Sequence, residues 1–360
     1  MELRNISMAI CLLFLKLAHA YECLHKVELE FSATQPIPLE YMVLTHGLET
    51  EHLNSHEPSE AYPNALLSEI GENLISMSFL TDEELQTLSE ESITRMGQEG
   101  IKLLKRASNN DYSPATRILA MCYISGHFID RDLIEGENYL RIAADKGDCI
   151  AQYELALLHI RGDLLHSNPY KAVNYLSLAA DQGYPDALFA LGTLYEQINS
   201  NIPTGIVPQS FPAAAQYYKQ AADKGSTNAQ LALGKCYLDG RGVQKNEEQA
   251  IELMTHAAQN GLPYAYTILG MRYHEGLGVS KNLEKSLEYI KLASDLGDPS
   301  AQIALGCFFL LDNQPIKQDR KEGLKWLKFA AKKGDSLAQE ALTLLNVFPS
   351  EQEEPGLMGR

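Results

Sequence analysis

The stretch that decides the fold of this chain reads Ala229-Gln-Leu-Ala-Leu-Gly-Lys-Cys-Tyr-Leu-Asp-Gly-Arg-Gly-Val-Gln-Lys-Asn246. A closely similar stretch starts 36 residues later, and its opening alanine recurs through most of the sequence. The matching positions, separated by 36, 36, 42, 36, 36 and 37 residues, are Ala115, Ala151, Ala187, Ala229, Ala265, Ala301 and Ala338. A near-constant period of this length is typical of stacked supersecondary units, so the sequence predicts a repeat architecture.

Each copy begins with a predicted helix. In the fourth copy its apolar and small residues fall on one side of a helix with 3.6 residues per turn, which predicts a packing face. These residues are Ala229, Leu233, Gly234 and Tyr237. A glycine inside a helix costs up to about 1 kcal/mol relative to alanine. A small residue beside the leucine in each copy therefore predicts that a neighbouring backbone passes close by.

A glycine-containing loop and a second helix complete the copy. Gly240 and Gly242 end the first helix, and an apolar face follows at Ala250 and the pair Ala257-Ala258. Gly261 comes three residues after this pair, where helices commonly end through a left-handed residue. Each copy is therefore predicted to be an αα-hairpin, and hairpins of this kind bury their apolar faces by stacking.

These residues resemble the Sel1-like repeat family, a relative of the tetratricopeptide repeat. The fourth copy matches the family pattern at nearly every fixed position, and the fifth repeats the match with Gly276, Gly278, Val279 and Asn282. The resemblance implies an all-α fold, a right-handed superhelical αα-hairpin solenoid, of the bacterial exported type. It says little about activity, because function depends on sites carried by a fold.

A short polar residue stands before the second helix of each copy and is expected to be its N-cap or a nearby turn former. These residues are Asp132, Asn168, Ser210, Asn246, Asn282 and Asp319. Six copies and a C-terminal capping helix are expected over 115–347, preceded by a degenerate capping repeat at 80–114. Residues 21–79 show no repeat and are expected to form a small cap or a partly disordered arm, and 348–360 a flexible tail.

Residues 1–20 have the pattern of a secretory signal. Arg4 stands in a short polar start, an apolar run follows from Ile6 to Leu15, and Ala18-His19-Ala20 offers a cleavage site. The run is too short to span a bilayer, which takes about 20 residues. The alternative is a buried N-terminal helix. The mature chain is expected to be exported, periplasmic or secreted, without stable membrane insertion.

The formal net charge is −17, from 47 acidic and 30 basic residues. This balance argues against nucleic acid as a partner, because nucleic acid binding needs a basic face. An acidic surface favours solubility or, at most, a basic partner.

Five cysteines follow the predicted cleavage site, so at least one is unpaired within a monomer. Cys122 and Cys236 occupy the same repeat position three units apart and are too distant to be bridged. Buried structural thiols are expected at Cys122, Cys236 and Cys307.

The search for reactive groups gives no catalytic residue. The sequence contains no Ser-x-x-Lys, Gly-x-Ser-x-Gly, His-Glu-x-x-His or Cys-x-x-Cys pattern. His46, His52 and His56 lie among carboxylates and could hold a divalent ion, but the composition around Pro58 favours an exposed linker. No metal and no cofactor are predicted.

Counted from the opening alanine of each copy, positions three, seven and ten of the first helix form a second stripe, separate from the packing face. An exposed apolar stripe of this length would bind a peptide or protein. The alternative is that these side chains pack between adjacent first helices. The residues predicted to contact a partner are Arg117, Met121, Tyr153, Leu157, Phe189, Thr193, Lys235, Met271 and His274.

Three functions remain open. The first is a non-enzymatic exported scaffold that binds a protein or peptide on its concave face; the resemblance implies envelope function or host-cell interaction, including virulence. The second is a hydrolase directed at the cell wall or at β-lactams, as in the cysteine-rich branch of the family, although regular cysteine pairs are missing here. The third is an adaptor in a eukaryotic secretory compartment.

Overall fold

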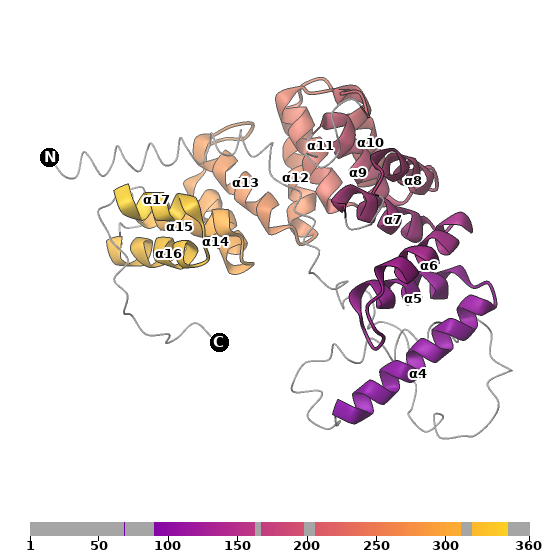
Figure 1. Ribbon diagram of the computed structural model, residues 1–360. Coiled ribbons are helices and arrows are strands. Elements are labelled where there is room, and N and C mark those ends of the chain that lie inside the picture. Colours follow the sequence, from indigo (N-terminus) through magenta and orange to yellow (C-terminus); the bar gives the residue numbers. More distant parts are fainter. Residues whose placement is uncertain (1–67, 69–89, 163–166, 198–205, 311–318, 345–360) are drawn as a thin grey trace. The chain divides into compact units, whose positions relative to one another are not determined.

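The computed structural model describes residue 68 and residues 90–162, 167–197, 206–310 and 319–344. Within these ranges every regular element is an α-helix, which confirms the all-α prediction (Figure 1). Several predictions concern residues outside these ranges and stay predictions: the signal segment 1–20, Cys23, the three histidines between His46 and His56, and the tail 348–360.

The described helices divide between two compact units. The unit within residues 28–209 contains α4 (Glu90–Asn109), α5 (Ser113–Ser125), α6 (Leu133–Asp145), α7 (Cys149–Arg161), α8 (Pro169–Asp181) and α9 (Pro185–Glu196). Each of these helices packs against the next one along the chain. The pairs α5–α6 and α7–α8 are αα-hairpins, and α4 packs against α5 as the second helix of a preceding repeat would.

The unit that begins at Ser210 contains eight described helices. They are α10 (Phe211–Asp223), α11 (Thr227–Asp239), α12 (Glu247–Gln259), α13 (Pro263–Glu275), α14 (Leu283–Asp295), α15 (Pro299–Leu310), α16 (Arg320–Lys332) and α17 (Ser336–Leu344). The hairpins are α11–α12, α13–α14 and α15–α16. The last helix, α17, packs against α16 and buries Ala338 and Leu342.

The second helix of every repeat begins at the polar residue predicted as its N-cap. Asn246 Oδ1 accepts a hydrogen bond from the backbone nitrogen of Gln249 at 3.1 Å, and Asp319 Oδ1 accepts one from Glu322 at 3.1 Å. The side chains that accept in this way are Asp132, Asn168, Ser210, Asn246, Asn282 and Asp319. Each cap satisfies a backbone N–H that has no partner within the helix, which fixes the start of these helices.

Glycines end the helices and allow close approach in the fourth repeat. Gly240 caps α11 with φ 69°, and Gly261 follows α12 with φ 89°. Gly242 has φ 72°, and a Cβ there would lie 2.0 Å from the carbonyl oxygen of Phe211. No other residue fits that position without moving the backbone of α10.

The two helices of the fourth repeat cross closely at Gly234. A Cβ at this glycine would lie 3.2 Å from the carbonyl oxygen of Ala250 and 3.1 Å from Met254 Cγ. The core around this crossing is buried at Ala229, Leu233, Ala250, Ala257 and Ala258, whereas Tyr237 is only partly buried at its edge.

Cys122, Cys236 and Cys307 are buried thiols, as the sequence predicts, and Cys149 is partly exposed; none of these four cysteines forms a disulfide. Burial raises the pKa of the Cys307 thiol to about 12. These thiols therefore pack as small apolar side chains.

Candidate functional site

The predicted first-helix stripe has members in both units, carried by α5, α7 and α9 in one and by α11 and α13 in the other. Its residues are Arg117, Met121, Tyr153, Leu157, Phe189 and Thr193 in the unit before Ser210, and Lys235, Met271 and His274 in the unit after it. Each unit has its own candidate face.

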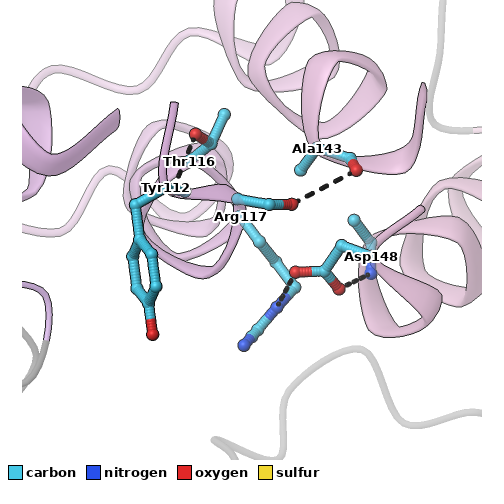
Figure 2. A network of polar contacts seen from close by, with 7 residues as sticks. Tyr112, Thr116, Arg117, Ala143 and Asp148 are labelled. Atoms are coloured by element: carbon cyan, nitrogen blue, oxygen red, sulfur yellow. Dashed lines mark hydrogen bonds and ion pairs between the residues drawn. The ribbon is translucent and has the colours of Figure 1, made fainter. Parts of the chain in front are cut away.

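Arg117 joins one repeat to the next. Its Nε lies 3.3 Å from Asp148 Oδ2, and the Arg117 and Asp148 side chains are only 18% and 8% exposed. Asp148 is also the N-cap of α7, because its Oδ1 accepts from the backbone nitrogen of Ala151 at 2.9 Å. Figure 2 shows Arg117 reaching from α5 to Asp148, beside the contacts that involve Tyr112, Thr116 and Ala143. The guanidinium therefore contacts a cap that helps to start the next repeat.

Three stripe residues in this unit are buried. Leu157 is 4% exposed, Thr193 is 3% exposed, and the ring of Tyr153 meets that of Tyr184 edge-on at 5.3 Å. Burial raises the pKa of the Tyr153 hydroxyl, and the nearby Asp186 carboxylate raises it further. These side chains offer little surface to a partner.

Met121 and Phe189 remain partly exposed. Met121 packs against the buried cluster formed by α5, α6 and α7, and the rest of its side chain is exposed to solvent. Together with Arg117, they are the members of the predicted stripe with accessible surface in this unit.

Sequence reasoning missed a charged group on the same helices. Glu154, one position along from Tyr153, is partly buried; burial raises the pKa of its carboxyl, while Arg161 and Arg117 oppose that increase. Burial also raises the pKa of the Tyr184 hydroxyl, as does its hydrogen bond to Asp186. The other five copies carry Ile118, Ala190, Ala232, Ile268 and Ala304 at the position of Glu154, so the repeat pattern gives no signal for this carboxylate. Glu154 and Arg117 place both signs of charge beside the stripe.

Within the unit that begins at Ser210, the stripe residues contact the following repeat. Lys235 Nζ lies 5.0 Å from the ring centroid of Tyr264, which stands at the start of α13. Met271 is 8% exposed and belongs to a cluster formed with α15. His274 meets the ring of Phe308 edge-on at 5.2 Å. Burial lowers the pKa of His274, and Lys281 lowers it further.

These contacts agree with inter-repeat packing at several stripe positions. The Thr267 hydroxyl donates to the Asp298 carboxylate, in the same arrangement as Arg117 with Asp148. Accessible surface is left chiefly at Arg117, Met121, Phe189, Lys235 and His274. Partner binding by the stripe stays a prediction, and these five residues are the places to test it.

Two further properties bear on function. Across the described residues, no helix is long and apolar enough to cross a membrane. In the same part of the chain, no group of three His, Cys, Asp or Glu side chains is arranged to hold a metal ion.

A family model described as the Sel1 repeat matches residues 113–148, 149–184, 185–226, 227–262, 263–298 and 299–335, which together make up more than half of the chain. The chain belongs to the Sel1 repeat family. The matched Sel1 repeats begin with α5, α7, α9, α11, α13 and α15, so each family match starts at a first helix of the structure.

Two solved structures are similar to this Sel1 repeat chain. A Sel1 repeat protein from Oxalobacter formigenes gives a TM-score of 0.60 at 23% identity, over 74% of this chain and 99% of that protein. A protective antigen present in uropathogenic Escherichia coli strains, which displays an SLR fold, gives a TM-score of 0.59 at 21% identity, over 86% of this chain and 67% of that protein. No curated protein matches the chain. At these identities the likeness shows the fold alone, an αα-hairpin solenoid.

Sel1 repeats mediate protein interactions, and proteins built from them are generally non-catalytic scaffolds. Membership therefore makes a scaffold for protein interaction the function class of this chain.

Proposed function

We propose that this chain is an exported, non-enzymatic scaffold that binds a protein or peptide on the first-helix face of its repeats. The role would lie in the bacterial envelope or in contact with a host cell. Export is supported by the signal pattern of residues 1–20, and the scaffold by membership of the Sel1 repeat family.

The observation that carries the binding face is the surface left on α5 and α9. Met121 and Phe189 stay partly exposed although most apolar side chains of the first helices are buried. Arg117 and Glu154 supply opposite charges on α5 and α7, next to this apolar surface. Apolar anchors with charged neighbours suit a peptide or protein partner better than an apolar small molecule.

Capture of a partner by the mature chain tests this function. The variant Met121→Asp/Phe189→Asp places two carboxylates on the face and should reduce crosslinked capture from envelope or host extracts at least about tenfold, which corresponds to 1.4 kcal/mol. Ile142→Asp is the matched control, because Ile142 is a 44% exposed apolar residue on the second helix α6. It should leave capture unchanged.

Circular dichroism and thermal melting must show that both variants fold. Equal capture by the wild type and the double variant would contradict the proposed face. Turnover of nitrocefin by the purified wild-type chain would contradict the non-enzymatic part of the proposal and support the hydrolase alternative.

A further inference from the structure

A polar groove lies between α10, α11 and α12. The helices α10 and α12 are the second helices of the third and fourth repeats, and α11 is the first helix of the fourth repeat. The volume of the groove is about 290 Å³. The residues that determine its chemistry are Lys219, Asp223, Tyr237, Glu252, Leu253 and His256. None of them belongs to the predicted first-helix stripe.

Leu253 breaks a pattern of aromatic residues in the sequence of the second helices. The equivalent position of the second helix carries an aromatic residue in each of the five other copies: Tyr139, Tyr175, Tyr217, Tyr289 and Trp326. The fourth repeat alone has an aliphatic residue there.

In the first, second and fifth repeats the aromatic residue at this position contacts the first helix of its own repeat, at the ninth position counted from the opening alanine. Tyr139 stacks on Tyr123 with ring centroids 5.5 Å apart and an interplanar angle of 10°. Tyr175 stacks on His159 at 6.2 Å and 11°. The ninth residue of the fourth repeat is Tyr237, which lines the groove together with Leu253. The Leu253 side chain has no ring that could stack on Tyr237.

The fifth repeat shows what fills the equivalent space. Tyr289 lies 5.7 Å from Tyr273 and 5.6 Å from Tyr266, measured between ring centroids. Lys285 Nζ lies 4.4 Å from the centroid of the Tyr273 ring and donates to its hydroxyl at 2.8 Å. The hydrogen bond to Tyr273 is the main reason why the pKa of Lys285 is raised. Aromatic rings and an ammonium group therefore occupy this space together.

The fourth repeat replaces each of these groups. Gln230 stands where Tyr266 does, Leu253 where Tyr289 does and Gln249 where Lys285 does, and all three line the groove. The ring that remains is Tyr237. The carboxylates of Asp223 and Glu252 also line the groove, where they would attract a cation, while Lys219 brings one positive charge. The chain as a whole has a formal net charge of −17, which favours a basic partner.

We propose that this groove binds an aromatic side chain adjacent to a basic one in a partner peptide. The aromatic ring would lie against Tyr237, in the place that Tyr289 takes in the next repeat. The ammonium group would lie near Asp223 and Glu252. No residue of the predicted first-helix stripe lines this groove, so the two proposals stand or fall separately.

The test is calorimetric titration of the purified chain with acetyl-Gly-Gly-Tyr-Lys-Gly-Gly-amide, alongside the same peptide with Ala in place of Tyr and with Glu in place of Lys. The Tyr-Lys peptide should bind at least about tenfold more tightly than either control peptide. Free tyramine, which carries the same ring and ammonium on one small molecule, forms a separate arm. Binding of tyramine without binding of the peptide would overturn the assignment to a peptide partner.

The deciding variant is Leu253→Tyr, which supplies the chain's own ring. Because tyrosine occupies the same position in four other repeats, this variant should fold and keep its melting temperature. Its affinity for the Tyr-Lys peptide should be at least about tenfold lower than that of the wild type. Unchanged peptide binding by folded Leu253→Tyr would overturn the proposal, as would failure of the wild type to bind the Tyr-Lys peptide.

A gain of binding gives an independent control. The variant Tyr266→Gln/Lys285→Gln/Tyr289→Leu makes the fifth repeat match the fourth at the three groove positions. It should add a second site, weaker than the first because Gln259 stands where Asp223 does in the groove of the fourth repeat. Glu252→Gln should weaken the Tyr-Lys peptide more than the peptide with Glu in place of Lys. A folded triple variant that still binds one peptide per chain would count against the proposed chemistry.

Discussion

The fourth and fifth repeats have the same hairpin backbone but differ in the side chains that fill the groove beside each hairpin. Both have two 13-residue helices, an asparagine N-cap on the second helix and a left-handed glycine after the first. The fifth repeat fills its groove with tyrosines and Lys285, whereas the fourth leaves about 290 Å³ open. The residues that fix the hairpin are therefore separate from those that decide what a groove can hold.

The largest effect is expected where the loops of the two repeats approach the preceding second helix. Gly242→Ala would place a Cβ 2.0 Å from the Phe211 carbonyl oxygen at a positive φ, so backbone must move, and about 3 kcal/mol of stability should be lost. At Gly278, the equivalent position, the nearest atom would be Glu247 Cβ at 3.2 Å, and Gly278→Ala should cost about half as much. Urea denaturation measures both losses. Equal losses would show that the two loops approach their neighbours equally closely.

A smaller effect is expected from exchanging the groove residues. Tyr289→Leu removes two ring contacts and one cation–π contact and should destabilise the chain by about 1–2 kcal/mol. Leu253→Tyr, the reverse change in the fourth repeat, should shift stability by less than about 1 kcal/mol, since it fills a groove that is already open to solvent. Thermal melting compares them. A large loss in Leu253→Tyr would mean that the groove is too small to accept a ring.

The smallest effect concerns pH. His274 in the fifth repeat corresponds to Leu238 in the fourth, and burial lowers the pKa of His274, with a further contribution from Lys281. The unfolded chain therefore binds a proton more readily at this residue. The stability it contributes is present above its unfolded pKa of about 6.5 and is lost as the pH falls through and below that value.

His274→Leu should accordingly make the fall in stability between about pH 7.5 and about pH 5.5 shallower, by less than about 1 kcal/mol. His256→Gln is the control, because His256 lies exposed on α12. A steeper pH dependence in His274→Leu would contradict the assigned direction of the pKa shift.

The features that depend on local backbone conformation follow from the sequence. Asn246 starts α12 because an N-cap needs a side chain that accepts a hydrogen bond. Gly240 ends α11 because glycine adopts the left-handed backbone conformation with the least strain. These requirements act within a few residues, so the periodic pattern alone predicts the hairpins.

The accessible face is harder to predict because it depends on the neighbouring repeat. Thr193 and Met271 are buried, while Met121 at the same kind of position is partly exposed. The distance and rotation between consecutive hairpins decide which stripe residues are buried. The 3.6-residue period of a helix carries no information about that distance or rotation. The groove depends on Leu253, which interrupts a pattern instead of following one, and it becomes visible only when the same position is compared across all repeats.

The central claim is that this Sel1 repeat chain binds its partner through the first-helix face, and photocrosslinking from a single position tests it most directly. A benzophenone side chain placed at Phe189 on α9 should form a covalent adduct with the partner, whereas the same group at Leu178, a 42% exposed residue on the second helix α8, should not. Adducts read by mass spectrometry from position 189 alone are the predicted result. Adducts from position 178 without any from position 189 would contradict the claim.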